Sequence, residues 1–289
     1  MSELKDIAKE LIESGKVKII VGYSDVQGGK RTKPIIVESL NETKNLVFNH
    51  YCLNNLAIYL TRKEIKDKGK IGIVAKGCDI RSILMLIKES QLKREDVYII
   101  GMNCSGVVED FGLEWNKDNI AVKCLTCTVQ KPHVSDIVVG DAPAEILKGE
   151  DKNLTLIEKI KVMTPEERFD FWVEEFEKCI RCYACRQVCP LCYCNKCIVE
   201  KTIPRWVESS AHKRGNTIWN IIRAFHLSGR CVGCGECERA CPVGIPLSVL
   251  NRSMTIVIKE EFNYITGMDI ETPTLIGTYD NKDKEDFIK

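Results

Sequence analysis

Cysteine is the residue whose number and spacing point most directly to chemistry in this chain. The 289 residues include 16 cysteines. Half of them form two runs with the spacing C-x₂-C-x₂-C-x₃-C-P, which are Cys179, Cys182, Cys185, Cys189 with Pro190, and Cys231, Cys234, Cys237, Cys241 with Pro242. In a chain without a secretory signal, such ordered spacing favours metal ligands over disulfides or over buried structural thiols.

The spacing of these runs is typical of bacterial ferredoxins that hold two [4Fe–4S] clusters. In such proteins the first three cysteines of a run bind one cluster, and the fourth binds the neighbouring cluster. The sequence therefore predicts two clusters, one on Cys179, Cys182, Cys185 and Cys241, the other on Cys231, Cys234, Cys237 and Cys189. Zinc is the alternative, but zinc sites usually use two C-x₂-C pairs.

Four further cysteines in the first half of the chain suggest a third cluster. Cys78 and Cys104 each follow a predicted strand, and Cys124 and Cys127 form a C-x₂-C pair. Parallel strands place residues at their carboxyl ends along one edge of the sheet, where open α/β sheets bind their ligands. The four thiols suit a cubane. The alternative is a buried Cys78 and Cys104 beside a C-x₂-C pair that binds zinc or nothing.

Three cysteines that directly follow the first run have no evident partner. Cys192, Cys194 and Cys197 are spaced closely enough to bind a metal, with Cys52 as a remote fourth ligand. They would then form a fourth cluster or a zinc site. Alternatively, they line the pocket of the first cluster and tune it through S–H and backbone contacts.

The sequence leaves a flavin site open. It contains no G-x-G-x-x-G motif, so a dinucleotide-binding fold of that type is unsupported. The loop 22–34 begins at Gly22 and carries Lys30 and Arg31, which would neutralise a flavin pyrophosphate. The same loop is equally compatible with a solvated hairpin.

The first half of the chain has the pattern of an α/β domain. Strands are expected at 17–23, 71–76, 97–102 and 136–141, with helices at 53–69 and 78–91. The strand–helix–strand unit around Cys78 predicts parallel pairing in a parallel or mixed sheet. We place the α/β domain at residues 1–150, with the boundary in the charged stretch 147–162.

The second half, residues 151–289, is predicted to be mainly helical with a polar C-terminal tail. Thr164, Pro165 and Glu167 form a capping box that begins a helix leading to Cys179. Amphipathic segments at 216–229 and 245–262 follow the two runs. This half resembles the helical dicluster ferredoxins of heterodisulfide reductase and succinate dehydrogenase iron–sulfur subunits.

Residues 17–145 resemble the beta subunits of coenzyme F420-reducing hydrogenases and related formate dehydrogenases. The matching segments are KGCDIRS with Cys78, GMNCSG with Cys104, and CLTC…SDIVVGD with Cys124, Cys127, Gly140 and Asp141. The resemblance implies one [4Fe–4S] cluster on these cysteines and a neighbouring FAD. The KGCD segment departs from the proline-containing turn common in that family, which puts the flavin site in question.

The order of the two halves resembles that of accessory iron–sulfur subunits in anaerobic redox complexes. We therefore expect an electron-transfer subunit that connects a dehydrogenase or hydrogenase module, such as formate dehydrogenase, to a heterodisulfide-reductase-like or other redox partner. The alternative is an FAD-dependent oxidoreductase subunit that takes hydride from coenzyme F420, NAD(P)H or a similar donor and passes single electrons to its clusters. The 42 basic and 41 acidic residues do not favour nucleic acid. The sequence shows no apolar run long enough to span a bilayer, so we expect a cytoplasmic protein.

Overall fold

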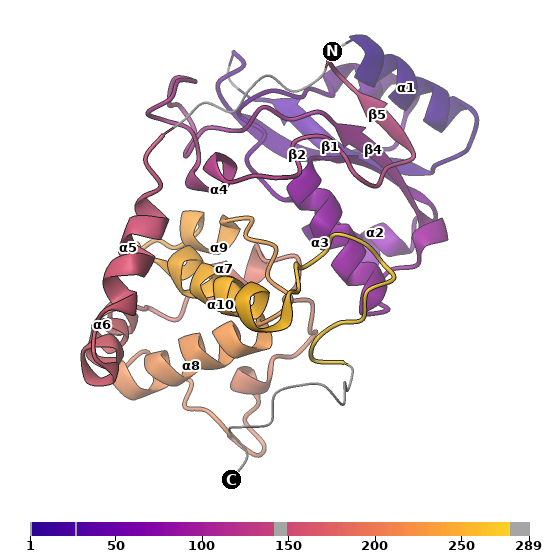
Figure 1. Cartoon of the computed structure of the whole chain (residues 1–289). Coiled ribbons are helices and arrows are strands. Elements are labelled where there is room, and N and C mark those ends of the chain that lie inside the picture. The colour runs from indigo at the N-terminus through magenta and orange to yellow at the C-terminus, as the bar shows by residue number, and fades with distance from the viewer. Residues whose placement is uncertain (1, 27, 142–148, 278–289) are drawn as a thin grey trace.

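The chain divides visibly into a sheet-containing half and a helical half (Figure 1). The structure is a computed structural model that describes residues 2–26, 28–141 and 149–277. The strands follow the order β2-β1-β3-β4-β5 across one sheet. They are β1 (Ile19–Asp25), β2 (Thr32–Val37), β3 (Ile71–Ala75), β4 (Val97–Met102) and β5 (Ile137–Val139).

The sheet is mixed, in agreement with the prediction of a parallel or mixed sheet. Strand β2 pairs antiparallel with β1, whereas β1, β3, β4 and β5 are parallel. Every residue of β3 and β4 is buried, which suits their uninterrupted apolar sequence because a parallel strand is covered on both faces. Helix α3 (Gly77–Lys88) connects these two strands, so the predicted strand–helix–strand unit is confirmed.

The prediction of one continuous helix over 53–69 is wrong. The segment instead contains the 3₁₀ helix η2 (Leu56–Thr61) and the short α2 (Lys63–Lys66), separated by Arg62 in an extended conformation. The side chain of Asn55 accepts a hydrogen bond from the Ala57 amide, and this contact begins η2. Arg62 is extended at the end of η2, which prevents one continuous helix over this segment.

The loop predicted at 22–34 is largely a hairpin. Strands β1 and β2 extend into it from both sides, and only a short turn remains between them. The other helices before residue 150 are short except for the first. They are α1 (Ser2–Glu13), η1 (Leu40–Asn45), η3 (Arg94–Asp96) and α4 (Val122–Leu125).

Helices make up the second half, as predicted, and two of them follow the ferredoxin runs. They are α5 (Lys152–Lys161), α6 (Pro165–Glu177), α7 (Ala184–Gln187), η4 (Ile198–Glu200), α8 (Lys213–His226), α9 (Glu236–Arg239) and α10 (Leu247–Phe262). The predicted capping box of α6 is present, with Thr164 and Glu167 each bonded to the other's backbone amide.

Most of the described part of the charged stretch at 147–162 is the helix α5. Residues 147 and 148 lie outside the described residues, but Asp151 caps α5 by accepting from the Leu154 amide. The same carboxylate forms two 2.8 Å hydrogen bonds with Arg252 on α10. The proposed domain boundary near residue 150 therefore directly precedes an ordered helix.

The two halves share contacts around α3. Arg230, at the start of the second ferredoxin run, forms a salt bridge with Glu89 at the end of α3. The part of the tail that the structure describes also packs here, since Arg81 donates to the Thr266 carbonyl and Gly267 lies directly against the Arg81 backbone. No helix in the described part of the chain is both long and apolar enough to cross a membrane.

Candidate iron–sulfur site

A cavity of about 430 Å³ is lined by eight cysteines from both halves of the chain. Four belong to the α/β half, and we call them the sheet set: Cys78, Cys104, Cys124 and Cys127. Four belong to the ferredoxin runs, and we call them the inner set: Cys189, Cys231, Cys234 and Cys237. The structure thus brings together both groups of four thiols that the sequence predicted as ligand sets.

The sheet set gathers at the carboxyl edge of the parallel strands. Cys78 lies in the first turn of α3, after β3, and Cys104 follows β4, which pairs in parallel with β3. The amide of Cys127 donates to the carbonyl of Cys124, so the C-x₂-C pair forms a tight turn. Gly77 permits this packing, because a Cβ at that position would lie 1.8 Å from the Val129 carbonyl oxygen.

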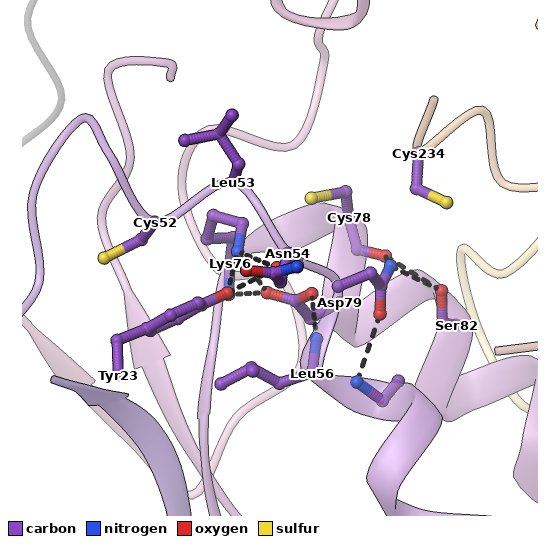
Figure 2. Close-up of polar contacts among 12 residues, drawn as sticks. Tyr23, Cys52, Leu53, Asn54, Leu56, Lys76, Cys78, Asp79, Ser82 and Cys234 are labelled. Carbon is purple, nitrogen blue, oxygen red and sulfur yellow. Dashed lines mark hydrogen bonds and ion pairs between the residues drawn. The ribbon is translucent and has the colours of Figure 1, made fainter. Parts of the chain in front are cut away.

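A buried ionic network holds the turn that carries Cys78 (Figure 2). The Nζ of Lys76 lies 3.0 Å from Oδ2 of Asp79, and both side chains are at most 2% exposed. Lys76 also donates to the Asn54 carbonyl and to the hydroxyl of Tyr23. Asp79 accepts from the amides of Lys76 and Leu56, so this network anchors both ends of the turn.

The two ferredoxin runs share one backbone conformation. The second and fourth residues after the first cysteine have positive φ in both runs: Arg181 and Tyr183 in the first, Gly233 and Gly235 in the second. In each run the second of these positions also begins a short helix, α7 or α9. An amide donates to the sulfur of the leading cysteine at 3.4 Å in both cases.

The remaining four ferredoxin cysteines line a second, smaller cavity. We call them the outer set: Cys179, Cys182, Cys185 and Cys241. Each cavity therefore contains three cysteines from one run and the fourth cysteine of the other, as the ferredoxin pattern predicted. Cys182 is exposed to solvent, whereas Cys185 is buried.

Burial raises the pKa of most of these thiols. It raises the pKa of Cys104 and Cys231 to about 12 and that of Cys185 to about 11. A thiol must lose its proton to bind a metal, so binding here has to supply an anion-stabilising partner. Backbone amides contribute, since Val107, Arg181, Gly233 and Ile245 donate to the sulfurs of Cys124, Cys179, Cys231 and Cys241.

Lys123 lies between the sheet set and the inner set. Its ammonium donates to the carbonyls of Leu53 at 3.2 Å and Cys234 at 2.9 Å, and it lies 3.5 Å from Glu236. Burial by itself lowers the pKa of Lys123, but Glu236 and the nearby thiols raise it above its ordinary value. A positive charge is therefore held between two groups of sulfur ligands from opposite halves of the chain.

The donor atoms fit polynuclear iron–sulfur groups. Each set offers four soft sulfur ligands, and iron–sulfur clusters are held by such thiolates. The sulfurs surround cavities, and no three His, Cys, Asp or Glu side chains in the described ranges converge tightly enough for one metal ion. The buried Nε of Arg223, which lines the large cavity, has no hydrogen-bond partner. An anionic group in the cavity would supply one.

The three cysteines after the first run do not gather. Cys192 packs on the core of the sheet half, Cys197 packs on the core of the helical half, and Cys194 is exposed. None of them lines either cavity. A hydrogen bond from Cys192 lowers the pKa of Cys189, so Cys192 contacts the inner set. Cys52 is fully buried beside Tyr23 (Figure 2).

The residues predicted for a flavin are dispersed, and none lines the cysteine cavity. Gly22 lies inside β1, where a Cβ would lie 2.4 Å from Leu46, so packing explains this glycine. Lys30 forms a salt bridge with Glu114, and Arg31 lies over the ring of Phe111. Gly140 and the exposed Asp141 follow β5, at the opposite side of the sheet from β2.

Sequence reasoning did not single out Lys76, Lys123 or Arg223. Lys76 and Lys123 each lie next to a predicted ligand motif. A basic residue in that position could have indicated a positive charge that stabilises the thiolates. Arg223 follows Asn216 and Asn220 at helical spacing, a polar stripe on a predicted amphipathic helix. Its position beside the cysteines depends on contacts far apart in the sequence.

Comparison with known proteins agrees with this arrangement. Residues 175–245 match the 4Fe-4S dicluster domain family. The F420-dependent formate dehydrogenase subunit beta of Methanocaldococcus jannaschii is 26% identical over 84% of this chain and 86% of that protein. The F420-dependent formate dehydrogenase 1 subunit beta of Methanococcus maripaludis is 24% identical over 74% and 77%, respectively. The predicted resemblance is confirmed: this chain is a beta-subunit-like iron–sulfur protein with a 4Fe-4S dicluster segment in its helical half.

Proposed function

We propose that this protein holds three [4Fe–4S] clusters, one on each cysteine set, and relays single electrons among them. The observation that carries the proposal is the sharing of one cavity by the sheet and inner sets. The inner and outer sets line separate cavities, but each contains the fourth cysteine of the other run, which connects them through the chain. The relay therefore runs through the sheet, inner and outer sets in that order, in either direction.

The chain supports such a relay by holding and shielding the clusters. When bound, clusters supply reversible one-electron chemistry in which the donor loses one electron, the acceptor gains it and no bond changes. The N–H···S hydrogen bonds stabilise negative charge on sulfur and so tune the potential. Lys123 stabilises charge between the sheet and inner sets, while the exposed Cys182 brings the outer set to the surface.

We also propose that the protein works as one subunit of a larger dehydrogenase. Both relatives are named beta subunits of formate dehydrogenases, and their similarity covers about three quarters or more of each chain. We assign bond chemistry on a substrate to a partner subunit, with this chain accepting or delivering electrons.

A second candidate function adds FAD to the sheet half. The names of both relatives include F420, a deazaflavin that donates hydride, which is a pair of electrons. A flavin converts such a pair into single electrons for the clusters. Protein purified without oxygen and then denatured should release about one FAD per chain if this candidate holds. Release of no flavin from iron-loaded protein contradicts it and leaves the relay intact.

Serine substitutions test the ligand sets. Cys127→Ser in the sheet set and Cys234→Ser in the inner set should each remove about four of about 12 iron atoms, because each cubane contains four. Cys194→Ser is the matched control, since Cys194 is exposed and outside both cavities, and it should keep all the iron. Full iron content and an unchanged EPR spectrum in Cys234→Ser would contradict the assignment.

A further inference from the structure

We propose that Arg223 is a positioning residue whose buried charge sets the reduction potentials of the inner and outer clusters together. The inference rests on the proposed function, because it assumes that both cysteine sets hold clusters. It assigns a role to a side chain that belongs to neither ferredoxin run.

The polar face of α8 places Arg223 along the first run. Asn216 donates from Nδ2 to the Cys179 carbonyl at 2.7 Å, and Arg223 donates from Nη2 to the Cys185 carbonyl at 3.1 Å. These two contacts lie seven residues apart on one helix and hold two ligand-bearing segments of the outer set. The guanidinium also lines the large cavity that contains the inner set. Arg223 therefore lies between the two sets.

Arg223 is a buried cation without an acidic partner. It is 5% exposed, and its Nε has no hydrogen-bond partner. Buried charges are normally paired, because removing a lone charge from water is very unfavourable. Among the described residues no carboxylate forms a salt bridge with Arg223 or with the buried Arg181, whereas four other arginines of this half have one: Arg186 with Glu200, Arg230 with Glu89, Arg239 with Glu236 and Arg252 with Asp151.

Sulfur takes the place of the missing carboxylate. Burial opposes the charge of Arg223, and the surrounding thiols of Cys237, Cys189, Cys192 and Cys185 raise its pKa well above the ordinary value. Cys237 and Cys189 belong to the inner set and Cys185 to the outer set. The strongest of these effects come from cysteines in or beside the ferredoxin runs, and Arg223 also donates to the Cys185 carbonyl of the first run. The guanidinium is therefore positioned to compensate negative charge mainly on the inner and outer sets.

This placement has a directional consequence for the potentials. Reduction adds one negative charge to a cluster, and a nearby buried cation stabilises the added charge more strongly than water does. Arg223 should therefore raise the potentials of the inner and outer clusters above the values they would have without it. The sheet cluster should be affected less, which gives each protein sample an internal reference.

The test compares potentials in variants that remove or keep the charge. Arg223→Gln removes it, and Arg223→Lys keeps it. EPR-monitored redox titration of iron-loaded Arg223→Gln should show lower reduction potentials for the inner and outer clusters. The reduction equilibrium of each should shift about tenfold or more toward the oxidised form, equivalent to about 59 mV. Arg223→Lys should shift them by less. Arg94→Gln is the control, because Arg94 pairs with Asp136 in the sheet half, and it should leave all three unchanged.

Each remaining outcome decides the question. Unchanged potentials in fully iron-loaded Arg223→Gln overturn the inference, as does an equal shift of all three clusters. If Arg223→Gln loses iron, the test passes to Arg223→Lys. The inference is supported if Arg223→Lys keeps all its iron and has potentials near those of the unsubstituted protein, and a tenfold shift in Arg223→Lys overturns it. Iron loss in both variants assigns Arg223 a role in folding alone and also overturns it. An unsubstituted protein without iron contradicts the proposed function instead.

Discussion

At the scale of single residues, the two ferredoxin runs reach one conformation from different sequences. The positions with positive φ are glycines in the second run but Arg181 and Tyr183 in the first. A side chain in the left-handed region costs about 1 kcal/mol or more, so other contacts must maintain the first run. Arg181 supplies several, because its guanidinium donates to the Gly215 and Glu208 carbonyls and lies over the ring of Trp219.

Lys76 offers the sharpest test of a single buried charge. Lys76→Met removes the ammonium and leaves the carboxylate of Asp79 buried without its 3.0 Å partner. Breaking a buried ion pair in this way should lower the free energy of unfolding by about 3–5 kcal/mol. Anaerobic denaturant unfolding of the iron-loaded protein measures the loss.

The double variant Lys76→Met with Asp79→Asn is the control for this change. It removes both charges and keeps a side chain that can accept from the Leu56 amide. It should be more stable than Lys76→Met alone. A single variant as stable as the unsubstituted protein would show that the pair does not anchor the turn.

At the scale of elements, a helix that the sequence did not reveal connects the two ends of the helical half. Asp151 caps α5 and pairs with Arg252 of α10. Asp151→Ala removes both contacts and should lower the free energy of unfolding by about 2.5–4 kcal/mol, from about 1 for the cap and about 1.5–3 for the charged hydrogen bonds. Thermal unfolding of iron-loaded protein measures it.

Asp151→Asn separates the two contributions. Its amide oxygen can still cap α5, but the negative charge that attracts Arg252 is gone. The asparagine variant should therefore be less destabilised than the alanine variant. Equal losses in the two variants would assign the whole effect to the ion pair, and the cap would contribute nothing.

The elements with strong local signals were predictable. Strands β3 and β4 are uninterrupted apolar runs, and α6 begins with a capping box. The segment at 53–69 was not predictable, because its apolar spacing also fits one continuous helix, whereas the structure interrupts it at the extended Arg62. The sequence places the domain boundary in the charged stretch at 147–162 and does not reveal that Asp151 there contacts Arg252, which lies 101 residues away.

The candidate site was predictable to a similar degree. Ferredoxin spacing is local, so the inner and outer sets followed from the sequence, and the strand ends indicated the sheet set. The positions of the cations around these cysteines could not be predicted from the sequence. Lys123 meets the Cys234 carbonyl across 111 residues, and Arg223 meets the Cys185 carbonyl across 38. Contacts over such separations depend on how the two halves pack.

At the scale of the whole molecule, the contacts between the halves keep the sheet and inner sets in one cavity. Arg230 directly precedes Cys231 and pairs with Glu89 of α3, while Lys123 contacts Cys234 and Glu236. Ligand geometry on one side therefore depends on side chains from the other side. Loss of these contacts should separate the sheet set from the inner set.

Glu89 tests this dependence. Glu89→Gln removes the charge that holds Arg230, whose Nη2 lies 2.8 Å from Oε2 of Glu89. The free energy of unfolding should fall by about 1.5–3 kcal/mol, the contribution of hydrogen bonds to charged groups. The exposed Glu95, also in the sheet half, provides the control, and Glu95→Gln should stay within about 0.5 kcal/mol. Similar stability in both variants would mean that this pair does not join the halves.

The central claim is that three sets of thiolates hold iron–sulfur clusters that exchange single electrons. The most direct measurement is an EPR-monitored redox titration of anaerobically purified protein, with iron and sulfide counted on the same sample. We predict about 12 iron and about 12 sulfide per chain and three one-electron transitions, since each cubane contains four of each. Colourless protein that lacks iron, or that contains zinc alone and takes up no electrons, would contradict the account.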